Sequence, residues 1–279
     1  MSTALTVALA TLVFAGGSSN DQWKTRLAEV REQLPTEDFT IVRQSPFVVV
    51  GDEAPETVRA RARGTVKWAV DNLKELYFDR DPEEVLVIWL FADRQSYRTN
   101  AKTLFGSIPD SPYGYYSPHY KALVMNIATG GGTLVHEIVH PFMQANFPHC
   151  PAWFNEGMGS LYEQSAERNG HMVGLTNWRL AGLQEAITND RVPSFTTLLS
   201  TTADEFYNAD PGTNYAQARY LCYYLQEKGL LVDFYKAFHK AHTKDPTGLK
   251  TLRKILSTDD LPKFQEEWEA WVMELSFPS

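Results

Sequence analysis

The segment TLVHEIVHPFMQANFPHCPAWFNEGMGSLYE, residues Thr133 to Glu163, marks where the chain changes from mixed helix and strand to helix. Its apolar residues recur with helical spacing on both sides of a loop that contains two prolines. We therefore expect two consecutive helices, over residues 134–146 and 152–164. Because the loop between them is short, the second helix is expected to fold back over the first.

The patterns before and after this segment differ. Before it, apolar runs bounded by turn residues predict strands within 39–53 and at 83–91, 113–116 and 121–126, and helices at 23–34, 54–78 and 93–104. After it, helical spacing dominates, at 178–188, 215–228, 230–242, 249–256 and 261–275, with one short strand at 172–175. We therefore expect an α+β fold, with an α/β subdomain at 21–132 and a helical subdomain at 133–279. A cleft between two such halves is where a site is expected.

The composition excludes some classes of partner. The chain of 279 residues has a net charge of −8 and a pI of about 5.4. A nucleic-acid surface needs a basic stripe, and docking to anionic lipids needs basic clusters, so neither partner is expected. Cys150 and Cys222 are the only cysteines, and the sequence leaves open whether they pair or stay free.

The N-terminal residues 1–20 contain no charged side chain and include an apolar stretch from Ala4 to Ala15. This length suits the apolar core of a signal peptide and is short for a bilayer span. We expect a signal peptide or apolar leader at 1–20 and a secreted or periplasmic protein. One feature departs from a signal peptide, because no lysine or arginine precedes the apolar stretch. The alternatives are a disordered, weakly apolar start and membrane tethering by an uncleaved N-terminal segment.

The first helix of the opening segment carries His136, Glu137 and His140. Residues four apart lie on the same face of a helix, so both imidazoles can bind one ion, while Glu137 flanks it as a base for a metal-activated water. The rest of this helix is apolar, and burying three titratable side chains is costly unless they pair or bind a metal. With 7 histidines in the chain, chance placement gives this pattern about one time in a hundred.

Glu156 supplies the third ligand that a catalytic zinc site requires. It follows His140 by 16 residues, on the second helix of the hairpin. Gly157 and Gly159 flank it, and glycines, which cost about 1 kcal/mol each in a helix, suit a place where two helices approach closely. The alternative is a solvent-exposed glutamate on an ordinary helix.

HEIVH followed by WFNEG resembles the gluzincin zinc metallopeptidases. The full run over 133–163 looks most similar to the peptidase MA-like family, and it is distantly similar to aminopeptidase N and thermolysin. This resemblance implies a zincin-like fold, Zn2+ bound by His136, His140 and Glu156, and hydrolysis of peptide bonds with Glu137 as the general base. It further implies an oxyanion-stabilising residue downstream, for which Tyr215 is the first choice and Tyr207 and His171 are weaker ones.

The resemblance also implies that the strand before the motif helix, residues 122–126, is the cleft edge to which an extended peptide or protein substrate adds. The alternative is an ordinary strand of the sheet, and the sequence does not decide between the two. No Gly-x-Met-x-Asn segment precedes HEIVH, so an endopeptidase is favoured over an aminopeptidase. One alternative function is a gluzincin-like domain that binds zinc or peptide without turnover. Another is a helical interaction domain without metal.

Overall fold

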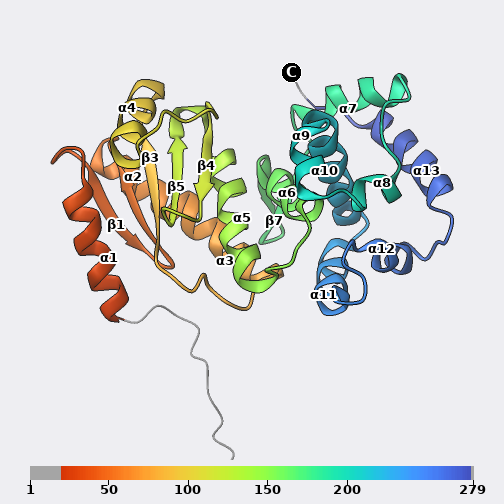
Figure 1. Ribbon diagram of the computed structural model, residues 1–279, viewed down its shortest axis with the longest axis horizontal. Helices are drawn as coiled ribbons and strands as arrows, with labels where there is room; N and C mark the ends of the chain where they lie inside the picture. Colours follow the sequence, from red (N-terminus) through yellow and green to blue (C-terminus); the bar gives the residue numbers. More distant parts are fainter. Residues whose placement is uncertain (1–19, 278–279) are drawn as a thin grey trace, which may run out of the picture.

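The structure is a computed structural model that describes residues 20–277 (Figure 1). The leader expected at residues 1–20 lies outside this range except for Asn20, which begins the first helix. The helices and strands, in chain order, are α1 (Asn20–Gln33), β1 (Thr40–Gln44), β2 (Phe47–Gly51), α2 (Pro55–Arg61), η1 (Ala62–Lys67), α3 (Trp68–Leu76), β3 (Leu86–Phe91), α4 (Arg94–Phe105), β4 (Gly114–Ser117), β5 (Ala122–Asn126), η2 (Ile127–Thr129), α5 (Gly132–Asn146), α6 (Ala152–Tyr162), β6 (Ser165–Arg168), β7 (His171–Gly174), α7 (Arg179–Thr188), α8 (Phe195–Leu199), α9 (Ala203–Asn208), α10 (Pro211–Glu227), α11 (Leu231–Ala241), α12 (Leu249–Leu256) and α13 (Leu261–Glu274).

Five strands form the main sheet, in the order β1-β2-β3-β5-β4. The three inner strands run parallel, and each edge strand, β1 and β4, pairs antiparallel with its neighbour. The central strand β3, with the sequence LVIWLF, is buried at every position. Such an uninterrupted apolar run is typical of a strand covered on both faces.

Helices cover both faces of this sheet. Alternate side chains of β3 point to opposite faces: Ile88 and Leu90 belong to the core shared with α2, η1, α3 and α5, whereas Trp89 and Phe91 pack with α1 and α4. Figure 1 shows α5 between the sheet and the helices of the second half. The helix that carries the His-Glu motif is therefore held by apolar contacts against a rigid sheet.

The second half is helical apart from the small β6-β7 hairpin. Its helices α6 and α10 are closely packed neighbours, and Arg219 of α10 donates to the carbonyl oxygens of Ser160 and Leu161 at the end of α6. One apolar core extends from Phe47 of β2 to Val272 of α13. Cys150 and Cys222 are both free.

The predicted combination of a mixed sheet in the first half with helices in the second is confirmed. The expectation that residues 122–126 form the cleft edge is wrong, because β5 lies between β3 and β4 and its backbone is paired on both sides. The edge of the sheet on this side is β4, and β1 forms the opposite edge. Among residues 20–277, no helix combines the length and the apolarity needed to cross a membrane.

Candidate metal centre

Helix α5 places His136 and His140 on one face. The centres of their two rings lie 4.8 Å apart, as expected for side chains separated by one helical turn. The apolar residues of α5 are buried against the sheet and α3. The imidazoles therefore point away from the sheet, towards α6.

Helix α6 returns over α5 and brings Glu156 to the two histidines. Its Oε2 atom lies 3.2 Å from His136 Nε2 and 3.8 Å from His140 Nε2. One ligand atom from each of the three side chains falls within 4.8 Å of the others. Two donors of a tetrahedral zinc ion are separated by about 3.3 Å, given metal–nitrogen bonds of about 2.05 Å. The observed spacing is close to this, so the group can hold a metal ion.

Two glycines make the close approach of α5 and α6 possible. A Cβ atom added at Gly159 would lie 3.0 Å from His136 Nε2, and one at Gly132 would lie 2.1 Å from the carbonyl oxygen of Glu163. Gly157 serves a different contact, because a Cβ there would lie 2.9 Å from Cys222 Sγ on α10. The prediction of close helix packing around Glu156 therefore holds, with one glycine facing the histidine and the other facing a third helix.

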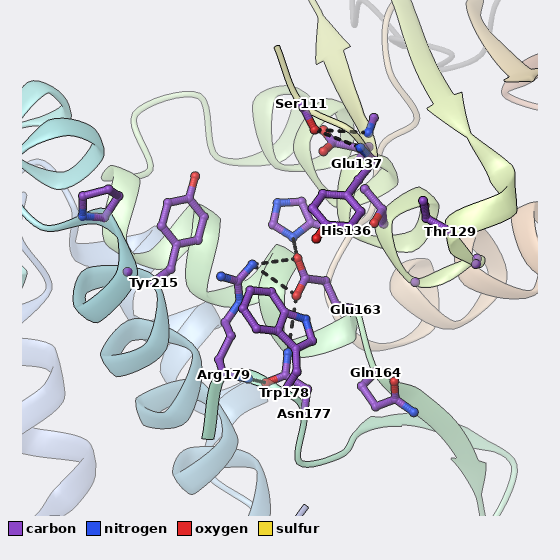
Figure 2. A pocket seen from close by; sticks show the side chains of 18 residues that line it. Ser111, Thr129, His136, Glu137, Glu163, Gln164, Asn177, Trp178, Arg179 and Tyr215 are labelled. Carbon is purple, nitrogen blue, oxygen red and sulfur yellow. Dashed lines mark hydrogen bonds and ion pairs between the residues drawn. The ribbon is translucent and has the colours of Figure 1, made fainter. Parts of the chain in front are cut away.

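The outward-facing atoms of the group also have partners. His136 Nδ1 lies 3.1 Å from Glu163 Oε1, and His140 Nδ1 lies 3.1 Å from Asn155 Oδ1. Figure 2 shows the first of these contacts, with Glu163 between His136 and Arg179. Such contacts fix the ring orientation and leave Nε2 of each ring facing Glu156, on the side where a metal ion would be held, as is usual for metal-binding histidines.

The second oxygen of Glu156 accepts a hydrogen bond from the Tyr207 hydroxyl at 2.7 Å. Tyr207 lies on α9, a short helix that the sequence patterns do not predict. The phenol therefore fixes the Glu156 carboxylate so that Oε2 faces the histidines.

Electrostatics favour a positive charge at this group. Burial alone would lower the pKa of His136, but Glu156 and Glu163 outweigh it and raise the pKa well above its usual value. Burial alone would raise the pKa of Glu156, yet its hydrogen bond with His136 and the charge of His140 bring it down to about 2. The pKa of Glu163 is likewise about 2, against the effect of burial, through His136 and Arg179. Both carboxylates are thus ionised at neutral pH and favour a positive charge between them.

Glu137 and Tyr215 lie where two cavities meet. One cavity, of about 810 Å³, opens towards Trp178 and Arg179, and the other, of about 510 Å³, opens towards Tyr116 and Phe147. His136, Glu137 and Tyr215 line both. Glu137 Oε2 is 3.9 Å from His140 Nε2, so its carboxylate flanks the group.

The structure thus brings together all five residues singled out in the sequence: His136, Glu137, His140, Glu156 and Tyr215. His171 lies elsewhere, beside Glu75 on the surface.

Sequence patterns do not assign Glu163, Asn155 or Arg179 to this site, and they place Tyr207 second to Tyr215. Glu163 follows Glu156 by seven residues, which is two helical turns and therefore the same face, and this spacing is a usable signal. Asn155 is part of the WFNEG string. No sequence pattern marks Arg179.

No family model matches the chain, and no curated protein is significantly similar to it.

Proposed function

We propose that this protein is a zinc-dependent metallopeptidase that hydrolyses peptide bonds. One observation carries the proposal: His136, His140 and Glu156 converge within 4.8 Å, with Glu137 beside them where two cavities meet. Two imidazole nitrogens and one carboxylate oxygen form the donor set of catalytic zinc sites that keep a fourth position open. When bound, zinc polarises a carbonyl group and lowers the pKa of a coordinated water.

The protein residues then have separate roles. Glu137 is the general base: its carboxylate accepts the proton of the attacking water and delivers it to the leaving amine. Glu163 and Asn155 hold the histidine rings in place. Tyr215 donates a hydrogen bond to the carbonyl oxygen as negative charge develops on it. Burial and the nearby charge of Glu156 raise the pKa of this phenol, so it keeps its proton at neutral pH.

Strand β4 is the proposed docking edge for the substrate backbone. Among residues 20–277 it pairs with β5 alone, which leaves its other edge free for β-strand addition. Residues at its two ends line different cavities: Gly114 lines the larger one, and Tyr116 lines the smaller one. An extended peptide along β4 would therefore pass the metal group with residues on both sides. This arrangement supports an endopeptidase rather than an aminopeptidase.

A metal measurement tests the proposed centre first. Purified wild-type protein is expected to contain about one zinc ion per chain, and His140→Ala is expected to lose it. His242→Ala is the matched control, because this half-buried histidine follows α11 and contacts Phe147, His239 and His149 rather than the metal group. A metal-free wild type that also fails to take up added zinc would refute the centre.

A peptide-library digest tests turnover. Wild type is expected to cleave peptides internally, whereas Glu137→Gln retains zinc and loses cleavage by a factor of at least about a hundred, as expected for removal of a general base. Equal cleavage by the two proteins would refute the assigned base. Zinc retention without cleavage in either protein would instead support a domain that binds zinc or peptide without turnover.

We also propose secretion, which sequencing the N-terminus of the exported protein would test.

A further inference from the structure

We propose that Arg179 forms a carboxylate-binding subsite in the larger cavity, and that the enzyme therefore prefers peptides with a carboxylate on that side of the cleaved bond. This inference rests on the proposed peptidase function and names its substrate class. The carboxylate can belong to an aspartate or glutamate side chain or to the C-terminus of the peptide.

The two cavities differ in the charges that line them. Both have mixed polar and apolar walls: the smaller one includes Tyr116, Met143 and Asn155, and the larger one includes Ser111, Asn177 and Trp178. Within the described residues 20–277, Arg179 is the only lysine or arginine that lines either cavity. A positive charge is therefore present on one side of the metal group only.

Arg179 is held rigidly, and part of its guanidinium group is unused. Nη2 contacts both carboxylate oxygens of Glu163, at 3.0 and 3.3 Å. The guanidinium carbon lies 4.2 Å from the ring centre of Trp178 and 5.3 Å from that of Tyr215. Nε is buried without a partner, and among the described residues none accepts a hydrogen bond from Nη1. Figure 2 shows the guanidinium group inside the cavity, beside Trp178.

The free Nη1 atom of this guanidinium group suits one oxygen of a carboxylate. It donates a charge-assisted hydrogen bond, and the stacked rings fix the plane of the guanidinium group in advance. A phosphate group is disfavoured, because Glu137 and Glu163 line the same cavity and repel a dianion more strongly than a monoanion. Trp178, which is 61% exposed, covers one face of the guanidinium group and limits competition from water.

The distance to the metal group suits a substrate side chain. Arg179 reaches His136 through one carboxylate, with contacts of 3.0 Å from Nη2 to Glu163 Oε1 and 3.1 Å from Oε1 to His136 Nδ1. A group bound to Arg179 therefore lies within a residue or two of a peptide bond placed over the metal. The subsite acts on the ground state and on the transition state alike, so its effect should appear mainly in KM.

The test compares peptide pairs that differ in one charge. One pair differs by Glu against Gln at a single position beside the cleaved bond, and the second differs by a free against an amidated C-terminus. Wild type is expected to favour the carboxylate member of one pair by on the order of tenfold in kcat/KM, as for one charge-assisted hydrogen bond. The pair that shows the preference identifies which carboxylate is bound.

Substitutions distinguish two roles of Arg179: binding the substrate carboxylate and holding Glu163 in place. Arg179→Gln should abolish the preference, and Arg179→Lys should retain part of it. Glu163→Gln should increase the preference, because it removes a carboxylate that competes with the substrate for Arg179. It should also slow the cleavage of both peptides of a pair, because Glu163 holds the His136 ring. Arg191→Gln is the matched control on the surface, where this arginine pairs with Glu185, and it should leave the preference unchanged. An equal loss for both peptides in Arg179→Gln, or no preference in wild type, would overturn the subsite.

A binding measurement keeps this result distinct from the failure of the proposed function. Calorimetric titration of zinc-loaded Glu137→Gln with the same peptide pairs should show a similar ratio of affinities, again lost when Arg179→Gln is added. If no peptide is cleaved but the ratio is present, the subsite stands and the peptidase proposal fails. If peptides are cleaved but the two members of each pair have equal kcat/KM and equal affinity, the subsite is wrong and the peptidase proposal stands.

Discussion

Gly159→Ala is expected to weaken the metal centre while leaving the fold nearly as stable as before. The new Cβ atom would lie 3.0 to 3.1 Å from three atoms of the His136 ring, whereas an ordinary contact is about 3.5 Å. Relief therefore requires the ring to move by about 0.4 Å. Metal–ligand distances tolerate only about 0.2 Å. Since Glu163 holds the ring at Nδ1, we expect the affinity for zinc to fall about tenfold to a hundredfold, as for other disturbances of a ligand's support.

Two other helical glycines provide the comparison. At Gly157 the Cβ would lie 2.9 Å from Cys222 Sγ and 3.0 Å from the Ala218 carbonyl oxygen, so alanine must push α6 and α10 apart. Overpacking of this kind costs about 1–3 kcal/mol. At Gly182 on α7 nothing lies within 4 Å, so alanine should stabilise the protein by about 1 kcal/mol through helix propensity alone. At Gly159 the same gain in propensity offsets part of the strain.

The assays are urea denaturation of the metal-free proteins, followed by circular dichroism, and competition for zinc with a chromophoric chelator. The expected order of stability is Gly182→Ala, wild type, Gly159→Ala and Gly157→Ala, with Gly159→Ala within about 1 kcal/mol of wild type. Of the three variants, only Gly159→Ala should show a large loss of zinc affinity together with a small change in the free energy of unfolding. Wild-type affinity in Gly159→Ala, or an equal loss in Gly157→Ala, would refute the role assigned to this contact.

Three further substitutions test the surroundings of the site. Tyr207→Phe removes the hydrogen bond to Glu156 and should lower zinc affinity by about tenfold, measured with the same chelator, without loss of helical signal. Arg219→Met leaves two carbonyl oxygens at the end of α6 without their buried donor. It should lower the free energy of unfolding, measured by urea denaturation, by about 2–4 kcal/mol. A loss no larger than that caused by replacing an exposed arginine with methionine would contradict this role. Tyr77 and Tyr162 share a buried hydrogen bond of 2.7 Å, and burial raises the pKa of both phenols. Their contribution to stability is therefore complete below about pH 10 and is lost as the pH rises further; denaturation midpoints at pH 8 and 11 should differ less in Tyr162→Phe.

The sequence predicted most of this fold because its elements are long and strongly patterned. The run 83–91 is apolar enough that only a central strand accommodates it, and it contains β3. Elements of four to six residues were missed: α8, α9 and β6. A helix of one turn has no periodicity to detect, and β6 is polar and partly exposed because it forms a surface hairpin. Tyr207 lies on one of these short helices, so local patterns do not place it beside Glu156.

The candidate ligands were predictable because their spacing reflects geometry within one helix or one hairpin. His136 and His140 are one turn apart, and the short loop after Asn146 returns Glu156 to them. The sheet edge was assigned wrongly because strand order is set by long-range pairing, which local patterns do not contain. Arg179 was missed for the same reason. It joins the site through the path of the chain after β7, and nothing in its neighbouring residues indicates a cavity wall.

The charges around His136 explain why one arginine belongs beside this centre. Glu137, Glu156 and Glu163 place three carboxylates around two imidazoles, within largely buried surroundings. Arg179 neutralises one of them through Glu163, which leaves two negative charges for a divalent ion to balance. Without the arginine, a bound divalent ion would leave one buried negative charge unpaired, at a cost of several kcal/mol. With it, the three carboxylates, the arginine and a divalent ion sum to zero, so a substrate carboxylate at Nη1 of Arg179 would meet a neutral centre instead of a negative one. The arginine that balances the charge of Glu163 is therefore also the residue proposed to bind the substrate carboxylate.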